Sequence, residues 1–245
     1  MICPICTSSQ SHPIPLQRRR KENRRFFRCT NCTAVWEDPS TWLSERDEKA
    51  RYLLHQNHPE DSPYREYLEG ILRQVWEGIT YVSQKSPSGQ RLDILDYGCG
   101  PVPVVAPLLS HHGHRVTSYD PYFAPITLQG LYDLILCIEV AEHFKEPRKE
   151  FIQMATLLKE GGFLAIHTHR VPEDTKTLQD GGTKRIRPIG CFIAVLPWMF
   201  FRLVWEYLLW GSRKKTSGYF SGLFVSNSIL VQLLTGEYKK ADNGS

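Results

Sequence analysis

The sequence predicts an α/β fold, in which helices cover both faces of a sheet of short apolar strands. One observation is a strand that runs into Gly98 and Gly100, where a ligand can approach the backbone closely because glycine has no Cβ. A second is a strand that ends in Asp120, about where a nucleotide-binding α/β sheet places a carboxylate. Two more apolar strands follow, the last of them after an amphipathic helix. We expect the four strands at 92–97, 114–119, 132–138 and 161–167.

Length and composition fit a soluble globular protein. The 245 residues suffice for one α/β domain and a small additional module, and 41% of them are hydrophobic, with a formal net charge of +4. Seven cysteines are few for a disulfide scaffold of this length. The sequence opens with no charged-then-apolar leader, so we expect a reducing, cytoplasmic location.

The amino-terminal cysteines form two C-x-x-C pairs. Cys3 and Cys6 make the first pair, Cys29 and Cys32 make the second, and 22 residues separate the pairs. Each pair aims two thiolates at one point, and two such pairs complete a tetrahedral site for Zn²⁺. Redox-active or unrelated buried cysteines are the alternative, and the spacing favours zinc. A module this small buries little core, so the metal would supply much of its folding energy.

A basic run from Arg18 to Arg28 lies between the cysteine pairs, with Phe26 and Phe27 interleaved. Clustered arginines with exposed aromatic faces are what a nucleic-acid backbone and an unstacked base would contact, so RNA is one expected partner. The alternative is a solvated hairpin whose second strand, 25–28, leads into the second cysteine pair. We favour the hairpin, because basic runs are common on the surface of such modules.

A polar, helical segment separates the cysteine module from the sheet. Asp61 and Ser62 precede Pro63, which is a helix start signal. Six residues then keep a helical stripe, namely Tyr67, Ile71, Leu72, Val75, Ile79 and Val82. We therefore expect a zinc-ribbon-like module at 1–40, a helical cover at 41–90, the α/β core at 91–180 and a divergent tail at 181–245.

Four features in register resemble the class I S-adenosylmethionine (SAM)-dependent methyltransferases. They are D-x-G-x-G at 96–100, the acid Asp120, Y-D-L-I-x-x-x-E-x-x-E-H at 132–143 and L-L-K-E-G-G-F-L at 157–164. A nicotinamide fingerprint, G-x-G-x-x-G, is excluded because Pro103 stands at its third glycine. The chain departs from the methyltransferases at Val102, where that family usually has a further glycine.

The resemblance implies a Rossmann-like core that binds SAM. The backbone at Gly98 and Gly100 would run alongside the methionine portion of SAM. Asp96 would organise this loop and the amino group of SAM, and Asp120 would hold the ribose hydroxyls. The cofactor-binding residues implied in this way are Asp96, Gly98, Cys99, Gly100, Asp120, Pro121 and Glu139.

The catalytic candidates follow the third strand and are Glu139, Glu142 and His143. By resemblance, Glu139 points to where the methyl group is transferred. The Glu142–His143 pair could act as acid or base, or it could shape the pocket, since it recurs in subfamilies with different acceptors. His167 and His169, at the end of the fourth strand, could line the acceptor pocket or be structural.

The resemblance stops after Gln179. The family continues close to W-W-Y-x-x-D-P-T-H-x-x-F-Y, whereas this chain reads D-G-G-T-K-R-I-R-P-I-G-C-F-I from Asp180. Codons that encode this segment give W-W-Y-K-T-D-P-T-H-R-V-F-Y when read from their third base. We therefore hypothesise that residues from about 180 onward come from a shifted reading frame, which sequencing of the encoding DNA tests. In that case the sheet would lack its final antiparallel hairpin.

The tail also contains an apolar segment at 189–210, about the length that a bilayer requires. Pro197, Arg202 and Glu206 lie inside it, and charges within a membrane span are costly. We therefore expect no stable membrane association.

The sequence thus predicts SAM-dependent methyl transfer. An amino-terminal zinc module before this fold resembles both ribosomal-RNA guanine methyltransferases and sugar C-methyltransferases. The basic run favours RNA as acceptor, but the modest charge of +4 and the many carboxylates of the core favour a small molecule, which we expect. The alternative is a zinc-ribbon scaffold that binds RNA or protein and carries a degenerate methyltransferase domain, which Val102 and the aberrant tail would suit.

Overall fold

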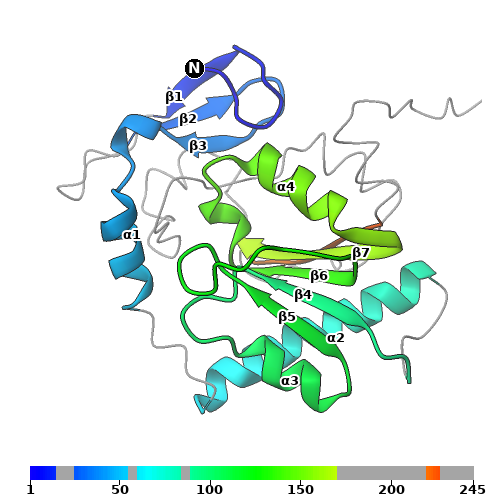
Figure 1. Cartoon of the computed structure of the whole chain (residues 1–245). Coiled ribbons are helices and arrows are strands. Elements are labelled where there is room, and N and C mark those ends of the chain that lie inside the picture. Colours follow the sequence, from blue (N-terminus) through cyan, green and yellow to red (C-terminus); the bar gives the residue numbers. More distant parts are fainter. Residues whose placement is uncertain (15–24, 55–59, 84–88, 170–218, 227–245) are drawn as a thin grey trace, which may run out of the picture.

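The computed structural model describes residues 1–14, 25–54, 60–83, 89–169 and 219–226. Within these residues, a small three-stranded sheet at the amino terminus precedes a five-stranded sheet with helices on both faces (Figure 1). Among the described helices, none is both long enough and apolar enough to cross a membrane. The apolar segment at 189–210, the start of the aberrant tail and most of the basic run lie outside the described residues.

The amino-terminal sheet is antiparallel, in the order β1-β2-β3. Its strands are β1 (Ser11–Ile14), β2 (Phe26–Cys29) and β3 (Val35–Glu37). A one-turn helix, η1 (Pro39–Thr41), follows directly and is capped by Asp38, whose Oδ1 accepts from the Ser40 N–H at 2.9 Å. The side chain of Arg25 pairs with the same carboxylate at 2.8 Å, so β2 and η1 are fastened together.

Two helices connect the amino-terminal sheet to the larger one. They are α1 (Glu45–Tyr52), capped by Ser44, and α2 (Ser62–Ser83), which begins at the predicted start signal. The buried face of α2 contains Leu68, Ile71, Leu72, Val75 and Ile79. Tyr67, which the helical stripe predicts in the core, is instead 36% exposed at the edge of that face.

The larger sheet has the order β5-β4-β6-β7-β8, and its first four strands are parallel. The strands are β4 (Asp93–Tyr97), β5 (Arg115–Tyr119), β6 (Tyr132–Ile138), β7 (Leu158–His169) and β8 (Tyr219–Ser226). The connections hold α3 (Val105–His111), the short helix η2 (Ala141–His143) and α4 (Pro147–Thr156). β8 runs antiparallel to β7, so the described part of the tail contributes one edge strand to the sheet.

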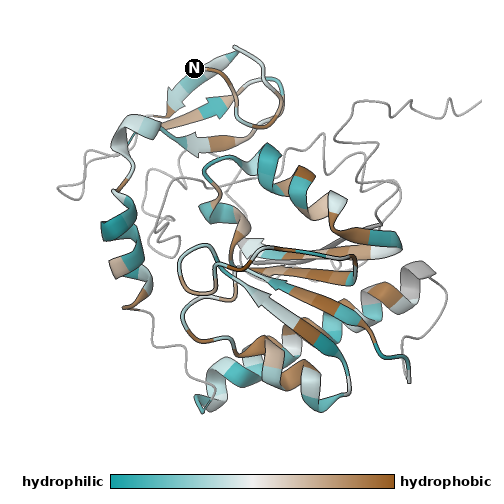
Figure 2. Cartoon of the chain, viewed as in Figure 1, coloured by the Kyte–Doolittle hydropathy of each residue, from teal (hydrophilic) through white to brown (hydrophobic). Residues whose placement is uncertain are grey.

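The alternation of side chains along the strands divides the core into two layers. On β6, Leu134 and Leu136 pack with α2 and α3, whereas Ile135 and Cys137 pack with α4. Figure 2 shows the resulting apolar strands between the two helical layers. The predicted α/β fold with helices on both faces is confirmed.

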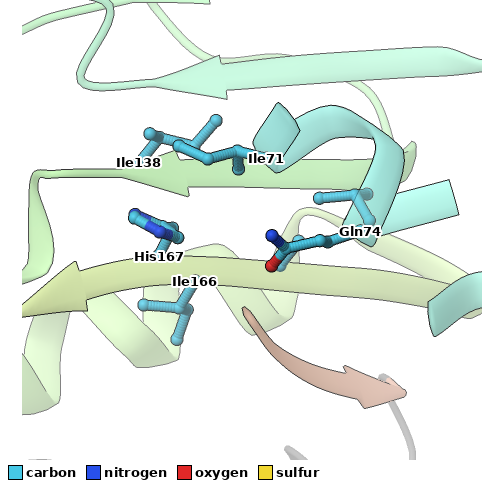
Figure 3. A pocket seen from close by; sticks show the side chains of 7 residues that line it. Ile71, Gln74, Ile138, Ile166 and His167 are labelled. Atoms are coloured by element: carbon cyan, nitrogen blue, oxygen red, sulfur yellow. The ribbon is translucent and has the colours of Figure 1, made fainter. Parts of the chain in front are cut away.

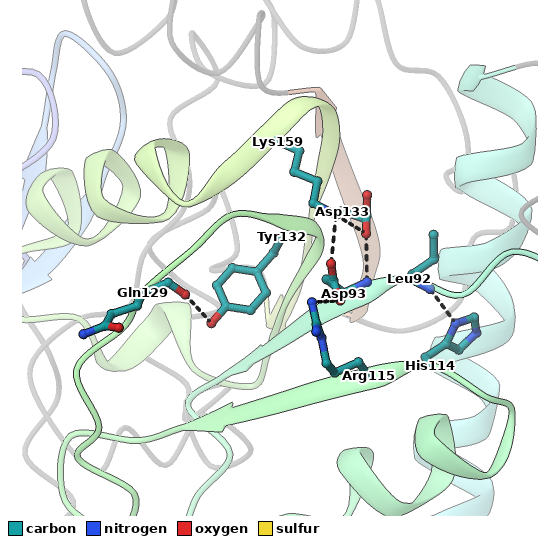
Figure 4. A network of polar contacts seen from close by, with 8 residues as sticks. All are labelled: Leu92, Asp93, His114, Arg115, Gln129, Tyr132, Asp133 and Lys159. Carbon is teal, nitrogen blue, oxygen red and sulfur yellow. Dashed lines mark hydrogen bonds and ion pairs between the residues drawn. The ribbon is translucent and has the colours of Figure 1, made fainter.

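A polar network holds the starting ends of the parallel strands together (Figure 4). Lys159 of β7 donates to Asp93 of β4 at 2.9 Å and to Asp133 of β6 at 2.8 Å, and Arg115 of β5 pairs with Asp93 at 2.6 Å. The hydrogen bond from Lys159 lowers the pKa of Asp93 against the effect of burial. Four adjacent strands are thus fixed in register at their amino-terminal ends. The loops with the predicted functional residues begin at the opposite, carboxyl ends of these strands.

Candidate functional site

The loop after β4 needs glycine at two positions for different reasons. Gly98 has φ +87°, and a Cβ there would lie 2.5 Å from the Val140 side chain, so this position sits tightly beneath the loop after β6. Gly100 has φ +69°, and a Cβ there would meet no atom of the described residues within 4 Å. Gly98 therefore shapes the loop, whereas the space beside the Cα of Gly100 is open among the described residues.

Asp120 joins this glycine loop to the loop after β5. One carboxylate oxygen accepts from the Gly100 N–H at 3.0 Å, and the other accepts from the Tyr122 and Phe123 N–H groups at 2.8 and 3.1 Å. Three backbone donors thus hold the carboxylate that the resemblance assigns to the ribose. Asp120 orders both loops in this structure, and its contact with a ribose stays a prediction.

Asp96, at the end of β4, is a buried carboxylate whose charge is poorly compensated. Among the described residues, its Oδ2 has no hydrogen-bond partner. Burial and, secondarily, the nearby charge of Asp120 raise the pKa of Asp96 from 3.8 to about 7. An ammonium group beside Oδ2 would satisfy that oxygen and favour its charged form. This is the position at which the resemblance places the amino group of SAM.

Glu139 lies directly after β6 and has a φ of +55°. This backbone conformation is unfavourable for any residue other than glycine. Its Oε1 accepts from the Tyr67 hydroxyl at 3.1 Å and lies 3.0 Å from Nδ1 of His167. The Tyr67 ring also meets the His167 ring edge-on, with 5.9 Å between centroids. Glu139 is therefore held in place by side chains from α2 and β7.

His167 is buried beneath α2, on the same side of the sheet as the side chains of Ile71, Gln74 and Ile138 (Figure 3). A cavity of about 10 Å³ remains between these residues, which is roughly the space for one water molecule. Together with Glu139 and Tyr67, His167 forms a polar cluster near the end of β7, beside the apolar side chains of Ile71 and Ile138.

Glu142 and His143 take different positions on η2. Glu142 is buried, and its Oε2 accepts from the Thr168 hydroxyl at 2.6 Å, which ties η2 to β7. His143 Nε2 lies 4.0 Å from Glu142, and its ring packs edge-on against Tyr52 of α1 at 5.7 Å. These contacts suit the interpretation of this pair as pocket architecture.

Cys99 and Pro121 lie in the two loops beside these residues. Burial, with the charges of Asp96 and Asp120, raises the pKa of Cys99 to about 12, so its thiol stays protonated at neutral pH. Pro121 is exposed at the surface of its loop. The backbone of Cys99 is bonded across the strands, since its N–H donates to the Tyr119 carbonyl at 3.0 Å.

The four amino-terminal cysteines converge as the spacing predicts. The sulfurs of Cys3 and Cys32 are 3.5 Å apart, those of Cys6 and Cys29 are 3.6 Å apart, and all four Sγ atoms lie within 4.8 Å of one another. A tetrahedral Zn²⁺ with bonds of about 2.3 Å requires sulfurs about 3.8 Å apart. A disulfide requires about 2.05 Å, and the cysteines are free thiols. The cluster therefore fits a zinc ion.

The turns after each cysteine pair repeat the same geometry. Thr7 and Thr33 have φ values of +60° and +62°, and each donates its N–H to the carbonyl of the first cysteine in its pair at 3.0 Å. The Asn31 side chain donates to Cys6 Sγ at 3.5 Å, which is the type of contact that orients a metal ligand. Both halves of the site are thus preformed.

The described residues of the basic run, 25–28, make contacts within the amino-terminal module. Phe26 is buried, and Phe27 stacks on Trp36 with 6.0 Å between ring centroids. Arg25 pairs with Asp38. The ring of Phe26 is therefore buried, and one face of the half-buried Phe27 ring is covered by Trp36, so fewer aromatic faces are left for contact with RNA.

Sequence reasoning missed three tyrosines around the site. The helical stripe predicts Tyr67 in the core, and no sequence pattern gives Tyr52 or Tyr64 a role. Burial, followed by the charges of Asp96 and Glu139, raises the pKa of Tyr64, which places Tyr64 close to both carboxylates. The sequence signal that could have indicated them is the presence of tyrosines on the helices that precede the strand with the glycine loop.

Comparison with known proteins identifies the family. Residues 64–207 match the model of a methyltransferase-domain family. No curated protein matches the chain. Similar solved structures include an O-methyltransferase family protein from Burkholderia thailandensis, with 14% identity and a TM-score of 0.40 over 74% of this chain and 62% of that chain.

Two further solved structures show comparable similarity. Coclaurine N-methyltransferase bound to N-methylheliamine and S-adenosylhomocysteine (SAH) has 18% identity and a TM-score of 0.38 over 63% of this chain and 55% of that chain. A protein from Pyrococcus horikoshii has 15% identity and a TM-score of 0.37 over 49% of this chain and 66% of that chain. The chain thus matches between 55% and 66% of the length of these structures. Because the family model covers more than half of its residues, the chain belongs to the methyltransferase-domain family.

Proposed function

We propose that this chain transfers the methyl group of SAM to a small-molecule acceptor. The observation that carries the proposal is the buried Oδ2 of Asp96, which lacks a partner among the described residues and lies beside the glycine loop. When bound, SAM supplies a sulfonium-activated methyl group, and an acceptor atom takes this methyl while the electrons of the broken C–S bond stay on sulfur. The protein therefore has mainly to bind and orient its two substrates.

Each group of the site has a part in this orientation. The carboxylate of Asp96 is suited to the ammonium of the methionine portion, and Gly100 lets that portion approach the backbone. Glu139, fixed by Tyr67 and His167, is suited to face the acceptor and to take the proton that an amine or hydroxyl loses on methylation.

The amino-terminal module is proposed to hold one Zn²⁺ through Cys3, Cys6, Cys29 and Cys32. The sulfur separations support this assignment. The metal would be structural, because four protein ligands leave no open coordination position.

A small acceptor is supported by the packing of Phe26 and Phe27, which leaves fewer ring faces for stacking on bases. An RNA acceptor would instead need the remaining basic residues of the run to bind phosphates in a salt-dependent manner.

The test is transfer of a labelled methyl group from SAM to cell-extract fractions separated into small molecules, RNA and protein. We expect label in the small-molecule fraction. Label in RNA would overturn the acceptor class, and SAH binding without transfer to any fraction would leave the chain as a binding scaffold.

A further inference from the structure

Helix α1 carries one buried carboxylate among mostly exposed residues. The side chain of Glu48 is only 3% exposed. Its Oε2 lies 2.6 Å from Lys145 Nζ and accepts from the Tyr122 hydroxyl at 2.9 Å. Burying a carboxylate costs free energy unless it is paired and hydrogen-bonded, so both contacts are needed to keep Glu48 in this position.

The two partners of Glu48 come from the two loops that border the candidate cofactor site. Tyr122 is two residues after Asp120, in the loop that follows β5. Lys145 is two residues after His143, in the segment that follows β6 and η2. A single carboxylate from outside the α/β core therefore connects both loops.

The connection continues to the glycine loop. Tyr122, which donates its hydroxyl to Glu48, also donates its backbone N–H to Asp120 Oδ1 at 2.8 Å. The other oxygen of Asp120 accepts from the Gly100 N–H at 3.0 Å. Three successive contacts thus lead from α1 to the backbone that would face SAM.

Other residues of α1 contact the same loop. Lys49 Nζ donates to the Tyr122 carbonyl at 2.9 Å and lies 5.4 Å from the centre of the Phe123 ring. The Tyr52 ring packs against Tyr122 and Phe123, with centroids 6.0 and 6.5 Å apart. The loop after Asp120 is therefore enclosed from one side by α1.

We propose that Glu48 is a positioning residue of the cofactor site, which sets the loop at 120–124 through Tyr122 and thereby determines the affinity for SAM and SAH. The inference rests on the proposed function, since it concerns the same site. Glu48 acts on Asp120 and the glycine loop through the Tyr122 hydroxyl. Its contribution therefore requires that hydroxyl.

The experiment measures the dissociation constant of SAH by calorimetry on the full chain for the wild type and for Glu48→Gln. The matched control is Glu45→Gln, the same change at an exposed position on the same helix. Glu48→Gln removes the charge that pairs with Lys145 and strengthens the hydrogen bond from Tyr122, so we expect it to weaken SAH binding about tenfold. Glu45→Gln should stay within about twofold of the wild type.

A double-mutant cycle separates positioning from general loss of stability. Tyr122→Phe removes only the hydroxyl, and it should weaken binding nearly as much as Glu48→Gln, while the double variant should be no weaker than either alone. Additive losses, or SAH affinity unchanged in Glu48→Gln, would overturn the inference. If Glu48→Gln fails to fold, wild-type affinity in Tyr122→Phe overturns it equally well. Failure of the wild type to bind SAH would instead refute the proposed function.

Discussion

Replacing Asp96 by Asn should stabilise the chain at neutral and alkaline pH. The free carboxyl ionises at about 3.8 in the unfolded chain, whereas burial keeps the folded group protonated up to about 7. Between these values the folded state binds more protons, so the stability of the wild type falls as the pH rises. At 1.36 kcal/mol per pKa unit, the full difference corresponds to about 4 kcal/mol. Asn is neutral throughout and avoids this loss.

The assay is urea unfolding of both proteins from pH 4 to pH 8. The difference in free energy of unfolding between Asp96→Asn and the wild type should grow in favour of the variant by up to about 4 kcal/mol between pH 4 and pH 8. Any constant difference from packing the amide is present at every pH and cancels from this comparison. A difference that is independent of pH, or that shrinks as the pH rises, would refute the reasoning.

Asp93 provides the matched control, because it is also an aspartate on β4 but its pKa is shifted in the opposite direction. Lys159 lowers the pKa of Asp93, so the contribution of Asp93 to stability is present above its unfolded pKa of 3.8 and is lost as the pH falls through its folded value. Asp93→Asn should therefore lose about 1 kcal/mol at pH 7, and this loss should shrink as the pH falls below 3.8.

Three further outcomes are expected. The chain should bind one Zn²⁺, and removal of the metal by a chelator should lower the melting temperature of the chain by several degrees. A melting temperature that the chelator does not change would exclude a structural metal. Gly98→Ala should destabilise the chain by about 1–3 kcal/mol in urea unfolding, because its Cβ meets Val140 and its φ is positive, whereas wild-type stability would contradict the tight packing of this loop. Tyr67→Phe should lower the rate of methyl transfer about tenfold with little change in SAH affinity, since it removes one contact that holds Glu139 and leaves Asp96 intact. Equal losses in rate and affinity would assign Tyr67 to the cofactor instead.

The sheet was largely predictable because its strands are buried and therefore apolar. β6 has the predicted bounds, and β4 and β5 each begin one residue later than expected. β7 begins three residues before its predicted start, because Leu158 and Lys159 already pair with β6 and Asp133. β8 was not expected, since the tail offered no pattern of the resembled family.

The site was predictable where the backbone sets the chemistry and less so where side chains from distant segments meet. Glycine spacing indicated the loop at 98–100, and cysteine spacing indicated the cluster. The role of Tyr67 at Glu139 depends on how α2 crosses the sheet, which helical spacing alone does not specify. Glu48 looked like one more charge on a polar helix, and only the packing of α1 against two loops distinguishes it.

The most direct measurement is SAH titration by calorimetry at pH 7 in buffers of different ionisation enthalpy. With a pKa of about 7, Asp96 is about half protonated in the free chain, and an ammonium beside it lowers that pKa. Binding should therefore release about half a proton and weaken as the pH falls below 7, and Asp96→Asn should bind more weakly and release none. Absence of binding at millimolar SAH, or binding without proton release that Asp96→Asn leaves unchanged, would contradict the proposed site.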